Sequence, residues 1–497
     1  MSKIKLYAIP VVFLVLGLSF GSRQFHWDTL ERAYLLEHYQ SFLKSWDGSP
    51  RSQFLSFAHV LELPLAAVVR VVLRSASGMQ TLIVFEALCA ALALLLVGRM
   101  ILHRTGGPFT ALAAQAVLAC CWGFWKMGTS GEERILGLAT LLLFLSAFWH
   151  ALHAGKRTIW VSFTLVLAIL SHLSNGVLVP FALLALLLLP ESLRAHRRRV
   201  SVSIVMGAGC SALLYAAVAA WTTAARTPGE LWEYLTFFHR DTGNNFLVMS
   251  HWRQHAHDMV HGLRLFLAEP RFAGLLALAT LVLLLLWAAR RRQTLLASME
   301  SRQLLLLAGL WSLHFIFYEP GNIESWTVVV TCLIVGVAFA LPSSRHAWWL
   351  ASIALLLGTA NATPFHRLHQ PMSLALYHRQ LQSASAPHDI ILLGGGIQQE
   401  RPLQGSLTTR FFLAHERDRT IVSLYDVLQI TQPEYWGRPI ASVEALQQQI
   451  DAGRHVWFPA SLQDEFARAQ QSGMFQMQTR AHGDSLVEVL SIQRLAP

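Results

Sequence analysis

Two carboxylates stand at the start of the hydrophilic segment that follows the first apolar run. Asp28 and Glu31 lie three positions apart in the sequence FHWDTLERAY. A carboxylate at a membrane surface can accept the proton of an acceptor hydroxyl, which is general-base chemistry, and the N–H groups at a helix start would keep it ionised. The same spacing is typical of a capping box. The pattern therefore predicts a helix that begins near Asp28, and a capping role and a catalytic role are both compatible with it.

Further polar groups stand at the ends of apolar runs. His172 interrupts one long run, Glu319 and Glu324 flank a Pro-Gly-Asn turn, and His59 lies at the start of the second half-apolar segment of the first loop. Polar groups at the end of a span tend to line a cavity rather than face lipid, so we predict substrate-binding roles for these four residues. Glu133 precedes another apolar run, where an acid could equally balance a helix dipole.

Three arginines in the long loop at residues 222–271 could hold a phosphate group. Arg226, Arg240 and Arg253 are spread along this loop. A guanidinium binds phosphate oxygens in a bidentate manner and always carries its charge. One or two of these arginines are therefore predicted to bind a phosphate group.

The same loop contains a histidine-rich segment. His251, His255 and Asp258 fall at positions i, i+4 and i+7 and would share one helical face. This spacing can bind a divalent metal ion, although histidine-rich helices at membrane interfaces more often hold none. No cofactor is assigned with certainty, and a metal site stays an open alternative.

The composition indicates that most of the chain is embedded in a membrane. Of the 497 residues, 54% are hydrophobic and 14% are charged, whereas a soluble protein carries about 25% charged residues. The net charge of +10 could suggest nucleic-acid binding. However, the arginines cluster in short loops between apolar runs, as membrane topology signals do, so nucleic acid is excluded as a partner. The five cysteines show no metal-binding spacing.

About eleven apolar runs approach the length that crosses about 30 Å of hydrocarbon. They lie near residues 6–21, 80–102, 108–126, 135–153, 158–171, 175–190, 200–223, 272–289, 303–318, 323–341 and 346–362. A cytoplasmic N-terminus places every dense basic cluster in a cytoplasmic loop, as the positive-inside rule expects. Large loops at residues 22–79 and 222–271 then face outside. The first run lacks a small-residue cleavage site and is predicted to be a retained span.

The predicted domain organisation is a transmembrane domain at residues 1–362 and an external α/β domain at residues 363–497. In the second domain, strands are expected at residues 389–393, 420–424, 455–458 and 486–492, and helices near 407–416, 443–451 and 462–471. The triple glycine at residues 394–396 lacks the rest of a phosphate-binding motif, so it is interpreted as a turn. This domain is expected to support the membrane part rather than to catalyse.

The order of these features resembles the GT-C glycosyltransferases. The resemblance rests on a first span followed by WDxxERAY, an amphipathic helix, SWDG and a second segment containing LPL. Protein O-mannosyltransferases and the lipid A aminoarabinose transferase are the most similar in style. The resemblance implies a catalytic acid at Asp28, a second acidic motif at Glu133 and a polyprenyl-phosphate-linked sugar donor. The commonest form has adjacent Asp and Glu, whereas here Thr29 follows Asp28, which leaves the role of Glu31 open.

These features lead to the hypothesis of a membrane glycosyltransferase of the bacterial inner membrane. It would transfer a sugar from the lipid-linked donor to an external lipid, glycan or protein acceptor, and direct displacement would invert the configuration of the sugar. A transporter of lipid-linked substrates is one alternative, but it predicts paired repeats with broken spans in both halves, which the sequence does not show. A polysaccharide polymerase or ligase is another, because such enzymes also use lipid-linked donors.

Overall fold

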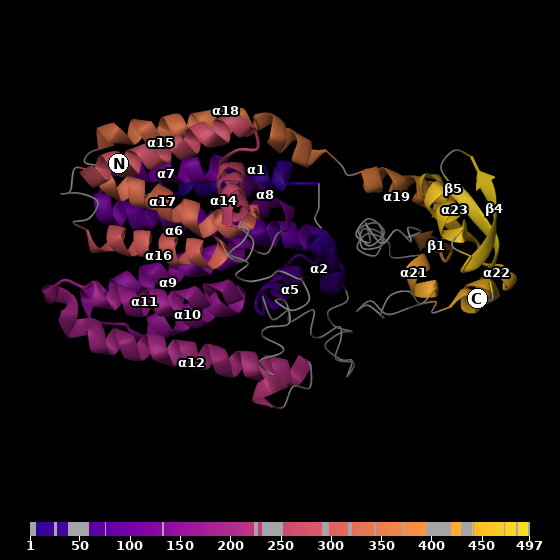
Figure 1. The fold of residues 1–497 in the computed structure, drawn as a ribbon, viewed down its shortest axis with the longest axis horizontal. Coiled ribbons are helices and arrows are strands. Elements are labelled where there is room, and N and C mark those ends of the chain that lie inside the picture. The colour runs from indigo at the N-terminus through magenta and orange to yellow at the C-terminus, as the bar shows by residue number, and fades with distance from the viewer. Residues whose placement is uncertain are drawn as a thin grey trace. The chain divides into compact units, whose positions relative to one another are not determined.

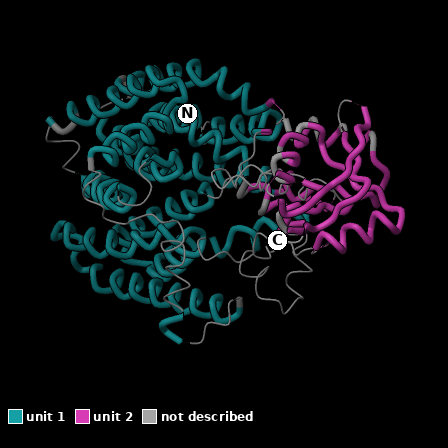
Figure 2. The backbone as a smooth tube through the Cα atoms, turned by 45° about the vertical axis from the view of Figure 1, so that its right-hand side comes forward, with its two compact units in different colours: residues 1–22, 55–72, 82–369 teal, residues 23–54, 73–81, 370–497 magenta. Residues whose placement is uncertain are grey.

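The structure is a computed structural model, and it falls into two compact units (Figure 2). Unit 1 comprises residues 1–22, 55–72 and 82–369, and unit 2 comprises residues 23–54, 73–81 and 370–497. The residues that the structure describes are 6–23, 27–37, 59–74, 76–131, 134–222, 227–230, 252–290, 298–316, 321–341, 344–370, 373–393, 419–428, 440, 442–471, 473–483 and 486–495. The predicted domain boundary after residue 362 falls inside a helix that ends at His369.

Unit 1 is a bundle of helices (Figure 1). Its α-helices are α1 (Ala8–Phe20), α5 (Glu62–Val72), α6 (Gly78–Thr105, with its first turn in unit 2), α7 (Pro108–Cys120), α8 (Trp122–Ser130), α9 (Arg134–Ala154), α10 (Ile159–Ser171), α11 (Leu178–Leu187), α12 (Arg197–Thr222), α14 (Trp252–Leu267), α15 (Arg271–Arg290), α16 (Met299–Ile316), α17 (Thr327–Ala340) and α18 (Trp348–His369). Short 3-10 helices are η2 (Leu173–Val177), η3 (Glu191–His196), η5 (Ile323–Trp326) and η6 (Ser344–Ala347).

Several of these helices could cross a membrane. Among the described residues, four stretches are long and apolar enough, and two bent pairs would raise the number to six. The bent pairs are α7 with α8 and α14 with α15, and three further apolar segments are shorter. The predicted multi-pass helical membrane domain is thereby confirmed, while the number of eleven spans stays a prediction.

The bundle contains interior helices and helices with a broad exposed apolar face. In α9, 78% of the most apolar window is buried, but only 33% is buried in the stretch that contains α12. Helix α10 packs against both of them, and Figure 1 shows these three helices side by side. Val205 and Leu213 of α12 are largely exposed. Such a contiguous apolar face is unfavourable in water, so we interpret this side of α12 as facing lipid.

Asn361 of α18 satisfies backbone groups at both bends. The bent pairs make angles of 71° between α7 and α8 and 96° between α14 and α15. The Asn361 side-chain amide donates to the carbonyl oxygens of Cys120 at 2.9 Å and Leu267 at 3.0 Å. Its oxygen accepts from the backbone N–H of Glu269 at 3.2 Å. Because a membrane offers no water to such groups, one side chain stabilises two broken helices.

Replacing Asn361 with Leu should therefore destabilise unit 1. Leu has the same branching and number of heavy atoms as Asn, but three buried or part-buried backbone groups lose a partner, and each unsatisfied buried group costs about 1–3 kcal/mol. We expect a clearly lower unfolding temperature of the full chain in detergent. Thr359→Val is the matched control, because it removes only an exposed hydrogen bond from Thr359 to the Leu355 carbonyl at 2.8 Å. Equal unfolding temperatures for the two variants would contradict the role assigned to Asn361.

Unit 2 contains a five-stranded mixed sheet among its described residues. The strands follow the order β2-β1-β3-β5-β4; β2, β1 and β3 are parallel, whereas β5 is antiparallel to β3 and β4. Their bounds are β1 (Ile390–Leu393), β2 (Thr420–Ser423), β3 (Val456–Pro459), β4 (Phe475–His482) and β5 (Leu486–Arg494). The helices are α2 (Trp27–Glu37), α19 (Ser373–Ala384), α21 (Leu424–Val427), α22 (Val443–Asp451), η7 (Ala460–Leu462) and α23 (Gln463–Gln471).

The sheet of unit 2 matches the sequence-based expectation closely. All four predicted strands are present, as are the helices expected at residues 443–451 and 462–471, whereas β4 was not predicted. The helix expected near residues 407–416 and the triple glycine lie outside the described residues. Leu392, Phe458 and Val489 are almost completely buried in the core of the sheet, and α22 packs against β5. The predicted small α/β domain is confirmed.

Candidate active site

The predicted helix with the candidate catalytic acid is α2, in unit 2. It begins one residue before Asp28, which confirms the predicted helix start. Leu30 and Ala33 are completely buried and lie on one helical face. At the end of α2, the Glu37 carboxylate accepts from the backbone N–H of Gly78 at 2.7 Å. A Cβ on Gly78 would lie 2.2 Å from the Ala33 carbonyl oxygen. The helix is thus held tightly against the first turn of α6.

Asp28 and Glu31 occupy the first turns of α2, but their side chains lie outside what the structure describes. Arg32 and Leu35, on the following turns of α2, are both buried. Four other predicted site residues also lie outside the described ranges, namely Glu133, Arg226, Arg240 and Glu319. The roles assigned to these six residues stay predictions.

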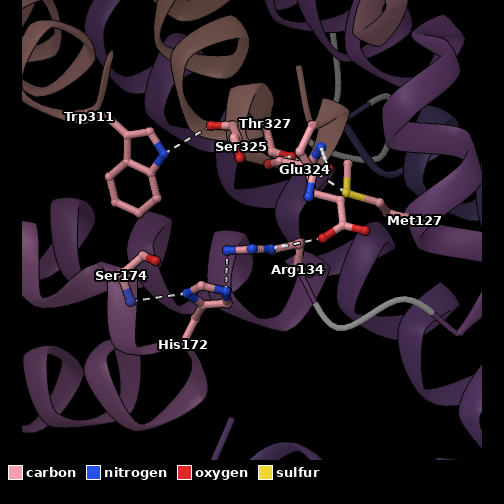
Figure 3. A network of polar contacts seen from close by, with 9 residues as sticks. Met127, Arg134, His172, Ser174, Trp311, Glu324, Ser325 and Thr327 are labelled. Atoms are coloured by element: carbon pink, nitrogen blue, oxygen red, sulfur yellow. Dashed lines mark hydrogen bonds and ion pairs between the residues drawn. The ribbon is translucent and has the colours of Figure 1, made fainter. Parts of the chain in front are cut away.

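In unit 1, Arg134 connects two of the predicted site residues (Figure 3). Arg134 is the first residue of α9, and its Nε donates to Oε2 of Glu324 at 3.0 Å. Its Nη1 contacts Nε2 of His172, and the guanidinium lies 5.8 Å from the ring centre of Phe315. The Arg134 and Glu324 side chains are only 13% and 18% exposed. The sequence analysis selected Glu324 and His172 but missed the arginine between them.

The turn that carries Glu324 is fixed by its neighbours. The Asn322 side chain accepts from the Glu324 backbone N–H at 3.0 Å, which caps η5. Thr327 Oγ1 donates to the Glu324 carbonyl at 2.7 Å, and the indole of Trp311 donates to the Ser325 carbonyl at 3.1 Å. These bonds hold η5 between α16 and α17. The Glu324 carboxylate is therefore presented to the guanidinium from an ordered backbone.

His172 lies in the break between α10 and η2 and faces two hydrogen-bond donors. The Ser174 backbone N–H donates to its Nδ1 at 3.1 Å, while Arg134 contacts its Nε2. Burial, and next the positive charge of Arg134, lower the pKa of His172 well below its usual value. A neutral imidazole offers one acceptor nitrogen and one N–H. Only one of the two ring nitrogens can therefore accept a hydrogen bond, and the Ser174 N–H and the Arg134 guanidinium compete for that role. Arg134 thus makes only a partial hydrogen bond to His172.

His59 joins this cluster from the first loop. Its ring centre lies 4.6 Å from that of His172, in an edge-on arrangement. The Leu61 backbone N–H donates to the Leu170 carbonyl at 3.1 Å, which ties the segment before α5 to the end of α10. His59, His172 and Glu324, predicted separately as substrate-binding residues, are thus brought together. Each of these three residues lies at the end of an apolar segment, and the sequence analysis assigns that end to the outer side of the membrane.

Two buried acids near this cluster were not singled out from the sequence. Glu62 of α5 and Glu86 of α6 are almost completely buried, and both lie within electrostatic range of the Cys89 thiol. The Glu62 backbone N–H donates to the His59 carbonyl at 3.2 Å. Buried ionisable residues in a membrane domain mark functional sites by default. They extend the polar region from His59 into the interior of unit 1.

Arg253 is the one described member of the predicted phosphate-binding arginines. It is an exposed residue in the first turn of α14, and α14 packs against η5. Asp258, also on α14, accepts a hydrogen bond from Gln254 at 2.9 Å, and its proposed metal-binding neighbour His251 lies outside the described residues. Within the described ranges, no group of three or more His, Cys, Asp or Glu side chains could hold a metal ion.

Comparison with known proteins shows the fold. No family model and no curated protein sequence matches this chain. ArnT from Cupriavidus metallidurans bound to undecaprenyl phosphate aligns at 13% identity over 98% of this chain and 97% of that one, with a TM-score of 0.60. The apo state of ArnT aligns at 12% identity over the same shares, with a TM-score of 0.57. The apo oligosaccharyltransferase of Archaeoglobus fulgidus aligns at 12% identity over 96% and 73%, with a TM-score of 0.50.

These neighbours confirm the predicted fold class. Both ArnT and the oligosaccharyltransferase are members of the GT-C fold, and the ArnT alignment includes the helical bundle and the C-terminal α/β unit. The chain therefore has the GT-C fold along nearly its whole length. At 12–13% identity, this likeness describes the fold, and the chemistry has to be argued from the residues of this chain.

Proposed function

We propose that this protein is a membrane glycosyltransferase that uses a polyprenyl-phosphate-linked sugar donor. The observation that carries the proposal is the fold likeness over 98% of the chain to an ArnT that binds undecaprenyl phosphate. Two features of this chain support it: a carboxylate in the first turn of the helix after α1, and a cluster in unit 1 that contains a guanidinium and two histidines. The acceptor is a lipid, glycan or protein on the outer side.

Asp28 is proposed to act as the general base. Its carboxylate takes the proton of the acceptor hydroxyl while the acceptor oxygen bonds to the anomeric carbon of the sugar. The bond from that carbon to the donor phosphate oxygen breaks, and polyprenyl phosphate leaves with the bonding electrons. One displacement inverts the anomeric configuration. Glu31 and Glu133 are proposed to assist, because the sequence places both acids in external loops.

The leaving phosphate needs positive charge, and we propose that arginines supply it. Arg134 is a candidate because its contact with His172 competes with the Ser174 N–H, so its Nη1 can exchange a poor acceptor for a phosphate oxygen. Its Nε remains bonded to Glu324, which orients the guanidinium. Arg253 is a second candidate on the helix that packs against η5, together with Arg226 and Arg240 from the same loop.

The remaining candidate residues are proposed to shape the substrate site. His59 and His172 form the edge-on pair beside Arg134, where a neutral imidazole can hydrogen-bond to sugar hydroxyl groups. Glu324 orients Arg134, and Glu319, which precedes η5 in the sequence, is proposed to contribute as well. We propose no metal requirement for the displacement, since one base and a stabilised phosphate are sufficient for it.

We propose that the protein resides in the bacterial inner membrane with a cytoplasmic N-terminus and a periplasmic C-terminal unit. A reporter that is active only outside the cytoplasm should be active when fused after Pro497 and silent when fused after Arg199. The positive-inside rule is the physical reason, because Arg194 to Arg199 would be held in the cytoplasm. The reverse pattern of reporter activity would contradict both the orientation and the external placement of the site.

The transferase activity is tested with the full chain in lipid nanodiscs and a radiolabelled polyprenyl-phosphate sugar. Addition of a membrane extract as acceptor source should move the label to a new product and release polyprenyl phosphate. Nuclear magnetic resonance of the product should show an anomeric configuration opposite to that of the donor. Movement of intact lipid-linked sugar between leaflets of sealed vesicles, with no cleavage, would instead support a transporter and overturn the proposal.

A further inference from the structure

A cavity of about 450 Å³ lies between the N-terminal ends of α10 and α12. Arg198, Arg199 and Val202 of α12 line it, and so does Ile159, the first residue of α10. The two helices are in direct contact at Ser162, whose Oγ donates a hydrogen bond to the Ser203 carbonyl of α12 at 2.7 Å. The cavity is therefore bounded by a packed helix pair.

Positive charge is concentrated at this cavity. α12 begins with Arg197, Arg198 and Arg199, and η3 leads directly into it. The N-terminus of α10 adds a partial positive charge, and α10 has no acid in its first turn. Among the described residues, no carboxylate forms an ion pair with Arg198 or Arg199, whereas Arg194 nearby pairs with Glu191 at 3.4 Å. Two guanidinium groups and the N-terminus of α10 thus face one cavity, an arrangement that favours an anion.

The backbone brings a second basic turn to the same end of the bundle. Gly155 has φ of +64°, and a Cβ at this position would lie 2.3 Å from the His196 ring. Only glycine fits this close approach without strain. The contact places the turn with Lys156 and Arg157, both exposed, against η3, directly before the arginines of α12.

The cavity continues into an apolar surface. Val202 and Met206 line it and are 52% and 53% exposed. Val205 and Leu213, further along α12, are also largely exposed. A phosphate group bound by the arginines would therefore have hydrocarbon-compatible surface directly next to it. A free anion would contact only the arginine-lined part of the cavity, whereas a lipid would contact both this part and the apolar surface of α12.

We propose that this cavity binds the headgroup phosphate of an anionic glycerophospholipid, with an acyl chain lying along α12. Arg198 and Arg199 donate charge-assisted hydrogen bonds to the phosphate oxygens. The basic loops at this end are those that the sequence assigns to the cytoplasm, where anionic lipids attract basic segments. The Arg134 cluster lies at the other end of α10, about 20 Å away at 1.5 Å per residue. This lipid site is separate from the proposed transfer site.

Native mass spectrometry of the delipidated full chain tests this proposal. Phosphatidylglycerol should bind more tightly than phosphatidylcholine with the same acyl chains. The double variant Arg198→Gln/Arg199→Gln should weaken phosphatidylglycerol binding roughly 30-fold, as two surface cations near an anionic lipid would, and leave phosphatidylcholine binding unchanged. Arg99→Gln/Arg290→Gln is the matched control, because it removes two exposed arginines that do not line the cavity. It should keep the wild-type affinity.

A second variant removes the space without changing charge. Val202→Trp should fill the cavity and weaken phosphatidylglycerol binding. The lipid-free variant should unfold at the same temperature as the wild-type protein. This variant also tests the proposed lipid site if the arginine variant does not fold. Unchanged phosphatidylglycerol affinity in these variants would overturn the proposal. Equal affinity for the two lipids would overturn it as well. So would inorganic phosphate that stabilised the protein as much as the lipid does, because the site would then recognise a free anion.

Discussion

Asp28→Asn should lower the turnover of sugar transfer by a factor on the order of 10²–10⁴, the usual contribution of a positioned general base. Asn has the same shape as Asp, and at the second residue of α2 it loses only the interaction of a charge with the helix dipole, which is worth about 0.3–1 kcal/mol. Asn cannot accept a proton at neutral pH. Membrane insertion, unfolding temperature and donor binding should therefore stay close to those of the wild-type protein, while turnover, measured with the labelled donor, falls.

Glu31→Gln is the control for this experiment. Glu31 lies inside α2, and Gln has nearly the same shape and helix propensity as Glu, so the variant should keep α2 and most of the activity. A loss comparable to that of Asp28→Asn would show that Glu31 carries or shares the catalytic role, a possibility left open by the Thr29 that separates the two acids. A folded Asp28→Asn protein with full transfer activity would contradict the proposed mechanism at its centre.

The sequence predicts the parts of the fold that depend on local patterns. Apolar length and the positions of the arginines identify the membrane bundle, and short β-branched runs identify strands such as β1 and β3. Strand β4 (FQMQTRAH) was missed because it is polar on its exposed face and lies at the edge of the sheet. Strand β4 is stabilised by antiparallel pairing with β5 along its length. Strand β5 follows β4 in the chain.

The bend between α7 and α8 could not be predicted, because its causes are distant in sequence. The apolar run at residues 108–126 was expected to be one span, but it forms α7 and α8 with an angle of 71°. No proline marks the break at Cys121. At the break, the Cys120 carbonyl oxygen accepts a hydrogen bond from Asn361. In α8, Gly123 packs so closely that a Cβ at this position would lie 2.4 Å from the Phe266 ring. Neither contact leaves a local signal.

The residues of the candidate site also divide into those that a local sequence pattern reveals and those that only distant contacts reveal. His172 and Glu324 were found because polar residues at the ends of spans are rare and functional. Arg134 was missed because an arginine before an apolar run is typical of a helix flank. Its partners lie 38 and 190 positions away in the sequence. Only the packing of α9 against η2 and η5 shows that this arginine is inside the cluster.

Arg134→Met should destabilise unit 1 by about 3 kcal/mol, the lower end of the range for breaking a buried ion pair. Met replaces most of the volume but leaves the Glu324 carboxylate, 18% exposed, without its bond at 3.0 Å. The free energy of unfolding can be measured by titrating the full chain with SDS. Arg194→Met is the matched control. It breaks the exposed pair between Arg194 and Glu191, and it should cost less than about 1 kcal/mol.

A double-mutant cycle separates the ion pair from packing. Glu324→Gln removes the charge that Arg134→Met leaves behind, so the double variant should be more stable than the sum of the two single changes predicts, by about 1–3 kcal/mol. Arg134→Lys keeps the charge but loses the guanidinium's two separate donors. It should retain part of the stability yet weaken donor binding if Arg134 also holds the leaving phosphate. Arg134→Met and Arg194→Met variants of equal stability would show that the bond to Glu324 does not hold this cluster together.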